Sequence, residues 1–186
     1  MAIDSLRQMT VEEYFAFDEA SEYKNEYIDG EVIPMTGGTA NHAEIMWNLG
    51  FALGLRLSGG DFHFYTSAMR VRVSPTRYLY PDFSIVCGEP ELDENAINLF
   101  NPTLIAEVLS PATANRDRGF KRAQYQSIAS LRAYLVIDQF KAHVEVDSRQ
   151  DNIWQMQEYS GLDAILPLPA LGCELPLAEI YARISF

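Results

Sequence analysis

The segment that most constrains the fold of this chain is residues 104–109, which read Leu-Ile-Ala-Glu-Val-Leu. Successive side chains of a strand point to opposite faces, and here both faces are apolar apart from Glu107. This pattern is typical of a strand in a sheet that is covered on both sides. The segment therefore predicts a buried strand between layers of helices, with one carboxylate in its middle.

Glu107 is the first candidate functional residue, because an ionised carboxylate at a buried position is costly without a partner. The second is Asp82, which follows a proline and opens another apolar run. Two adjacent strands that carry an acid on a shared face would place oxygen ligands around Mg²⁺, which needs few protein carboxylates. The structural alternatives are a half-exposed strand or an ion pair with Arg70 or Arg72 for Glu107, and a turn role for Asp82.

Helical spacing and capping signals predict three helices and a terminal helical turn. Thr10 and Glu13 match a capping box, and a longer apolar pattern at helical spacing stops at a Gly-Gly pair. The expected helices, with approximate ends, are Thr10–Glu19, Asn41–Leu57 and Asn115–Ile128, and the expected turn is Pro176–Ile180.

Apolar runs and turn signals predict the strands. Asp29-Gly30 predicts a two-residue hairpin turn, and residues 88–102 read as a loop. The expected strands are Tyr23–Ile28, Glu31–Met35, Phe62–Thr66, Ala68–Val73, Asp82–Cys87, Thr103–Leu109, Arg132–Asp138, Lys141–Asp147 and Ile153–Tyr159. Together these elements predict a mixed α/β (α+β) sheet flanked by helices, with an N-terminal β-hairpin.

Length and composition indicate an ordered protein. With 186 residues, 48% of them hydrophobic, the chain is expected to form a single domain, 1–186, with its motifs at about 10–138 and a strand-rich tail at 139–186. No apolar stretch approaches a membrane span, and the first residues lack a signal-peptide pattern. Two cysteines without metal-site spacing, Cys87 and Cys173, favour a cytoplasmic protein.

The net charge limits the partners. Fourteen basic residues against 26 acidic ones give a formal charge of −12. A polyanion such as DNA would be repelled at long range, because phosphate binding normally depends on Lys and Arg. A function on DNA therefore requires a local basic surface or a metal-dependent site.

Lys121 is the third candidate. It lies on the predicted helix that directly follows the Glu107 strand, with Arg118 and Arg122 beside it and Tyr125 one turn further on. The alternative is a solvent-exposed ion pair between Lys121 and the acid four residues before it, which would contribute only about 0.2–0.5 kcal/mol.

In this order and spacing, the motifs resemble those of the Uma family of predicted endonucleases, within the PD-(D/E)XK, restriction-endonuclease-like superfamily. The resemblance covers about residues 10–138. The residues that carry it are Pro81-Asp82, Glu107-Val-Leu-Ser110-Pro111, Asp117, Lys121, Tyr125, the segment Glu26–Glu31 and His42.

The resemblance implies a restriction-endonuclease-like core and a Mg²⁺-dependent endonuclease, with Mn²⁺ as a substitute, that hydrolyses phosphodiester bonds of DNA. The implied metal ligands are Asp82, Glu107 and the backbone carbonyl of Val108, with Glu31 as a further ligand on the hairpin. The resemblance also implies a homodimer, since two sites related by a two-fold axis can cut both strands.

One departure concerns the lysine that the superfamily places two residues after the acid. Leu109 occupies that position, and the resemblance implies that Lys121 takes over its catalytic role. Arg118 and Arg122 are candidate phosphate contacts or solvated helix charges. His42 is an accessory candidate or a packed helix-start residue. Tyr125 is expected to pack against the core beside the site.

Three hypotheses remain open at this point. The first is a metal-dependent endonuclease acting on DNA. The second is a catalytically inactive nuclease-like scaffold that acts as a binding or interaction module, which the net charge favours. The third is a metal-dependent hydrolase of a smaller phosphoester, for which the sequence shows no motif of its own. The distance between the Asp82 and Glu107 carboxylates and the direction of Lys121 discriminate between them.

Overall fold

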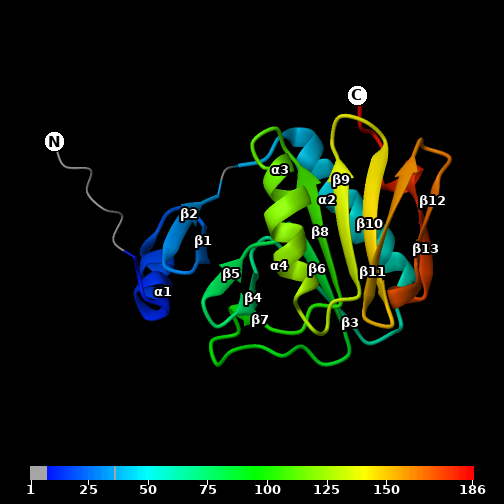
Figure 1. Ribbon diagram of the computed structural model, residues 1–186. Helices are drawn as coiled ribbons and strands as arrows, with labels where there is room; N and C mark the ends of the chain where they lie inside the picture. The colour runs from blue at the N-terminus through cyan, green and yellow to red at the C-terminus, as the bar shows by residue number, and fades with distance from the viewer. Residues whose placement is uncertain (1–7, 36) are drawn as a thin grey trace.

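Six strands form the main sheet of the protein, in the order β11-β10-β9-β8-β6-β3 (Figure 1). Its members are β3 (Phe62–Thr66), β6 (Phe83–Cys87), β8 (Leu104–Leu109), β9 (Ala133–Asp138), β10 (His143–Gln150) and β11 (Ile153–Ser160). β8 and β9 run parallel, and the other neighbours are antiparallel. The computed structural model describes residues 8–35 and 37–186, so the first residues, from which no signal peptide was predicted, lie outside it.

Helices cover both faces of this sheet. On one face lies α2 (Ala40–Arg56), and on the other lie α3 (Ala114–Arg116), the π-helical turn η1 (Asp117–Lys121) and α4 (Arg122–Gln126) (Figure 1). All six residues of β8 are buried. Its even-numbered residues pack with α2, and its apolar odd-numbered residues pack with α4. This confirms the strand predicted between two layers and turns Glu107 toward α4.

A second, five-stranded sheet carries the N-terminal hairpin, in the order β2-β1-β5-β4-β7. Its strands are β1 (Asn25–Ile28), β2 (Glu31–Pro34), β4 (Arg70–Ser74), β5 (Arg77–Leu79) and β7 (Asn98–Leu99), and α1 (Val11–Ala20) packs beside it. Asp29 and Gly30 both have positive φ, as the predicted two-residue turn requires. Thr10 and Glu13 form the predicted capping box.

The C-terminal region packs against α2 and completes its side of the core. It consists of β12 (Ile165–Leu168), the 3₁₀ turn η2 (Pro169–Leu171), β13 (Cys173–Pro176) and α5 (Leu177–Ile180). The sequence predicted only the final helical turn here. Three prolines interrupt the short apolar runs, which hid the β12–β13 hairpin. In the described part of the chain, no helix has the length and apolar character needed to cross a membrane.

Candidate active site

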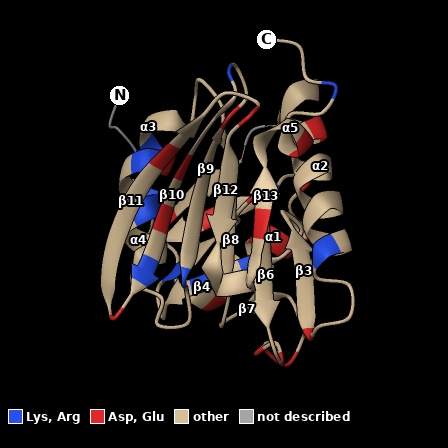
Figure 2. Cartoon of the chain, turned by 90° about the vertical axis from the view of Figure 1, so that its right-hand side faces the viewer, with Lys and Arg blue, Asp and Glu red and all other residues tan. Residues whose placement is uncertain are grey.

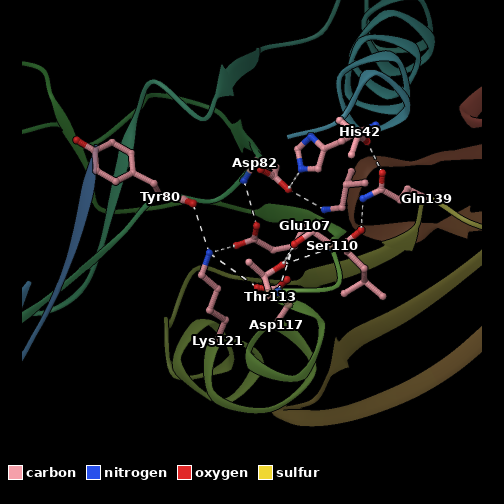
Figure 3. Close-up of polar contacts among 12 residues, drawn as sticks. His42, Tyr80, Asp82, Glu107, Ser110, Thr113, Asp117, Lys121 and Gln139 are labelled. Carbon is pink, nitrogen blue, oxygen red and sulfur yellow. Dashed lines mark hydrogen bonds and ion pairs between the residues drawn. The ribbon is translucent and has the colours of Figure 1, made fainter. Parts of the chain in front are cut away.

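A cleft of about 1170 Å³ is lined by the β1–β2 hairpin, α2, β6, β8 and the π-helical turn. Its polar part contains the carboxylates Glu26, Asp82, Glu107 and Asp117 together with Lys121. Figure 3 shows most of these side chains pointing toward one another from separate elements. The topology therefore assembles residues that are up to 95 positions apart in the chain.

Asp82 and Glu107 lie side by side, as the sequence predicted. The backbone N–H of Asp82 donates to Glu107 Oε2 at 3.3 Å, and the backbone N–H of Val108 donates to Asp82 Oδ2 at 2.8 Å (Figure 3). These two reciprocal hydrogen bonds link the start of β6 to the middle of β8 and hold both carboxylates at one point of the sheet. Glu107 does not form the alternative ion pair, since Arg70 pairs with Asp18 on α1 and Arg72 lies over the ring of Phe100.

Lys121 points into the same cluster. Its Nζ lies 2.8 Å from Glu107 Oε1 and 2.9 Å from Glu26 Oε1, and it donates to the carbonyl of Tyr80 at 3.5 Å. The residue is 5% exposed. It is therefore not the solvent-exposed partner of Asp117, whose Oδ1 lies 4.0 Å away.

The π-helical turn explains how Asp117 and Lys121 both face inward. The predicted helix Asn115–Ile128 is interrupted over Asp117–Lys121, where the N–H of Arg122 donates to the carbonyl of Asp117 five residues back. The wider turn buries both side chains. Single π-helical turns inside α-helices occur frequently at functional sites, and hydrophobic spacing alone does not reveal them.

Arg118 and Arg122 point to the sheet, not to the cleft. Arg118 Nε donates to Glu145 Oε1 at 2.6 Å, while Arg122 pairs with Glu145 and, at 2.8 Å, with Asp147 Oδ2. Figure 2 shows these acidic positions of β10 beside the basic positions of the helical segment between α3 and α4. Both guanidinium groups are engaged by protein carboxylates, so the contact with phosphates expected from the sequence has no support in this arrangement.

Glu26 is the site residue that sequence reasoning missed. It is 1% exposed, accepts the N–H of Tyr80 at 3.1 Å and lies 2.5 Å from Arg116. The hairpin does bring a glutamate to the site, but Glu31, the expected ligand, is exposed and does not line the cleft. The available signal was an acid at a buried position of a strand, the same signal that identified Glu107.

His42 and Tyr125 both contact the carboxylate pair. His42 lies in the first turn of α2, and its Nε2 is 3.0 Å from Asp82 Oδ2 (Figure 3). The hydrogen bond to Asp82 raises the pKa of His42, against the opposing effect of burial. The hydroxyl of Tyr125, buried as predicted, donates to Glu107 Oε1 at 3.0 Å.

The cluster holds more carboxyl groups than cationic side chains. Burial raises the pKa of Glu107 well above its usual value, and the charge of Lys121 offsets this only in part. Burial also raises the pKa of Asp117. For Lys121, burial acts to lower the pKa, but the carboxylates of Glu107, Glu26 and Asp117 outweigh it and hold the amine protonated. Burial thus favours the protonated form of two of the four carboxyl groups, which lie beside the cations Lys121 and Arg116.

A divalent cation would stabilise the ionised forms of these carboxyl groups. Within residues 8–35 and 37–186, no three His, Cys, Asp or Glu side chains are arranged to hold a metal ion. The Asp82–Glu107 pair is nevertheless enough for Mg²⁺, which binds through one or two carboxylates and keeps several waters. The buried Oδ1 of Asp117, which has no hydrogen-bond partner among the described residues, is a further oxygen beside the pair.

Comparisons with known proteins agree with this arrangement. Residues 11–178 match the protein family Uma2, described as "Putative restriction endonuclease". Two relatives from Synechocystis sp. carry the names "Uncharacterized protein sll1609" and "Uncharacterized protein slr1290". The first is 35% identical over 88% of this chain and 94% of its own length, and the second is 30% identical over 96% and 94%.

A solved structure shares the fold. It is the crystal structure of a "putative nuclease belonging to DUF820" from Anabaena variabilis, with a TM-score of 0.77 at 18% identity, over 95% of this chain and 99% of that one. The restriction-endonuclease-like core that the motifs predicted is therefore confirmed at the level of the fold.

Proposed function

The chain belongs to the Uma2 family, and from this premise we propose that it is a metal-dependent endonuclease that hydrolyses phosphodiester bonds of DNA. One observation carries the proposal. Although Leu109 occupies the position of the superfamily's lysine, Lys121 reaches Glu107 from the neighbouring helical turn at 2.8 Å, beside Asp82. Two acids and a lysine are thus together at one point of the cleft.

In this proposal Asp82, Glu107 and the carbonyl of Val108 would hold Mg²⁺. The bound ion would polarise the phosphoryl group and lower the pKa of a bound water. Glu26 and Asp117 lie close enough to the pair to add negative charge around the ion, and Asp82 is held in place by His42 and the N–H of Val108.

Lys121 would act through its charge and its N–H groups. An ammonium has three donors, and here they face Glu107, Glu26 and the carbonyl of Tyr80. With Glu107 holding the ion, the donor that faces it here would be available to orient the attacking water or to offset charge on the phosphate. Such positioning and electrostatic stabilisation are the main contributions of a protein to phosphoryl transfer.

The test combines metal binding and cleavage. Mg²⁺ and Mn²⁺ are titrated calorimetrically into wild type, Asp82→Asn and the control Asp163→Asn, whose exposed side chain lies outside the cleft. The same proteins are incubated with supercoiled plasmid and with circular single-stranded DNA. We expect metal binding and metal-dependent nicking in wild type and the control, and loss of both in Asp82→Asn.

Two results would contradict the proposal. If wild type binds no divalent ion, the carboxylate pair is structural and the scaffold hypothesis replaces the enzyme. If the ion binds but neither DNA is cut, the site is not that of a DNA endonuclease.

A further inference from the structure

One side of the cleft is aromatic and exposed. Trp47 is 66% exposed, Phe51 58% and Phe64 38%, and all three line the same cleft as Asp82 and Lys121. We call these three residues the aromatic wall. The rings of Trp47 and Phe51 lie nearly parallel, with centroids 6.4 Å apart and an interplanar angle of 18°. The wall therefore places exposed aromatic rings in the same cleft as the candidate catalytic groups.

The backbone beside these rings is open. Gly54 lies on α2 one turn from Phe51, and a Cβ added at Gly54 would meet no atom within 4 Å. Glycine destabilises a helix interior relative to alanine, and the packing of the protein itself does not require it here. Its effect is to leave bare backbone beside the rings, where a planar group can approach closely.

The cations of the cleft are few and already engaged. The lysines and arginines among its lining residues are Lys24, Arg116 and Lys121. Lys121 and Arg116 pair with Glu107 and Glu26, and Lys24 donates to a backbone carbonyl. A DNA duplex exposes its phosphates and stacks its bases inside, so it binds chiefly through Lys and Arg. With a net charge of −12 and few unengaged cations in its cleft, this chain provides few groups that could bind the phosphates of a duplex.

A single DNA strand with unpaired bases could bind to the aromatic wall by stacking. Its bases are free to stack on aromatic side chains, and this contact tolerates any base sequence. A second copy of the chain is a poorer occupant. The wall is one side of a concave cleft that also contains Asp82 and Lys121, and a copy seated there would cover the candidate catalytic groups.

We propose that the aromatic wall binds unpaired bases, so that the substrate of this nuclease is single-stranded or locally unpaired DNA. The inference rests on the proposed function of the same cleft. Stacking on Trp47 and Phe51 would supply the affinity that the few cations do not, and would place the adjoining phosphate at the carboxylate cluster. The proposal predicts that the affinity for single-stranded DNA depends only weakly on salt concentration. A protein that neutralises many phosphates would show a steep dependence.

The test uses the fluorescence of Trp47. The chain has two tryptophans, so Trp154→Phe leaves Trp47 alone as the reporter. A short phosphorothioate-linked oligothymidylate, which resists cleavage, is titrated with Mg²⁺ present at several salt concentrations, and a hairpin duplex of equal length serves as the comparison. We expect quenching by the single strand, little response to the duplex and a shallow dependence on salt.

Variants locate the contact. In anisotropy measurements with a labelled oligothymidylate, Trp47→Ala should weaken binding about tenfold or more, and Trp47→Phe should restore most of it. The matched control is Phe17→Ala, which removes an exposed aromatic ring from a helix outside the cleft and should leave binding unchanged.

Three results would overturn the inference: no quenching of Trp47, duplex binding as tight as single-strand binding with a steep salt dependence, or a dimer in sedimentation that Trp47→Ala dissociates. The last would make the wall an interface between copies.

Failure of the proposed function would give a different set of results. An ordinary oligothymidylate that quenches Trp47 but is never cut refutes the nuclease and supports the wall, whereas duplex cleavage without a Trp47 response refutes the wall and supports the nuclease.

Discussion

Replacing Lys121 with methionine should destabilise the protein strongly, and in a pH-dependent way. The substitution keeps an unbranched side chain that is one atom shorter, and it removes the charge that contacts Glu107 at 2.8 Å and Glu26 at 2.9 Å. Breaking a buried ion pair by removing one partner typically costs about 3–5 kcal/mol, because the other charge stays buried and uncompensated. Glu26 remains paired with Arg116 in the variant. The carboxylate left without a cationic partner is therefore mainly Glu107.

Protonation of Glu107 limits the size of this loss. The usual pKa is 4.5, so protonating the group at pH 7 costs about 3.4 kcal/mol at 1.36 kcal/mol per pKa unit. We therefore expect Lys121→Met to lower the free energy of unfolding by at most about 3.4 kcal/mol at pH 7. Lys121 lowers the pKa of Glu107, so the native variant holds a proton to higher pH than wild type. The deficit should shrink on acidification, by at most about 1.36 kcal/mol per pH unit.

Urea unfolding between pH 5 and pH 8, followed by circular dichroism, measures the deficit. The control Lys141→Met removes an exposed lysine and should stay within about 0.5 kcal/mol of wild type. Adding Glu107→Gln to Lys121→Met should recover stability, because no buried charge then lacks a partner. A deficit below about 1 kcal/mol, equal at all pH values, would refute the buried pair as described.

Three further predictions concern the surroundings of the site. Below the raised pKa of His42, binding of Mg²⁺ at Asp82 should release a proton; calorimetry in buffers of different ionisation heat detects it, and His42→Asn should abolish it. Burial acts to raise the pKa of Glu145, but hydrogen bonds from Arg118 and Arg122 lower it below 4.5. The stability that ionised Glu145 contributes is therefore present above pH 4.5 and lost as pH falls through the lowered pKa. Glu145→Gln should cost about 1–3 kcal/mol at pH 7 and less in acid, as urea unfolding at pH 7 and at pH 3 will show. Thr10→Ala should cost about 1 kcal/mol and Thr10→Ser should not, measured by the same method, because the hydroxyl of Thr10 caps α1.

The parts of the fold that depend on local rules were predictable from the sequence. The Asp29-Gly30 turn and the capping box at Thr10 need only a few neighbouring residues, and both are present as predicted. α2 begins and ends within one residue of its predicted bounds. The two-sided apolar pattern of β8 placed Glu107 correctly because alternation in a strand is strict.

Several contacts between distant elements were not predictable, although the pairing of Asp82 with Glu107 was. Glu26 became a site residue because β1 pairs with β5, which brings the hairpin to the start of β6. The sequence favoured Glu31, yet that residue is exposed. In the sequence, Arg118 and Arg122 look like a pair of phosphate-binding arginines. Only the position of β10 shows that both instead pair with Glu145.

The same β10 contacts bear on the proposal that Lys121, on a helical turn, takes the role of the superfamily's strand lysine. Leu109 packs in the apolar cluster beneath α4, so the ammonium must come from the π-helical turn, and its position depends on how that turn is anchored. Arg118 and Arg122 stand on either side of Lys121 and are held by Glu145 and Asp147. These two acids lie in the C-terminal tail, beyond the segment that carried the family resemblance. The tail thus helps to fix Lys121 against Glu107, and a chain truncated at about residue 138 would keep every motif but lose the carboxylates that anchor its lysine.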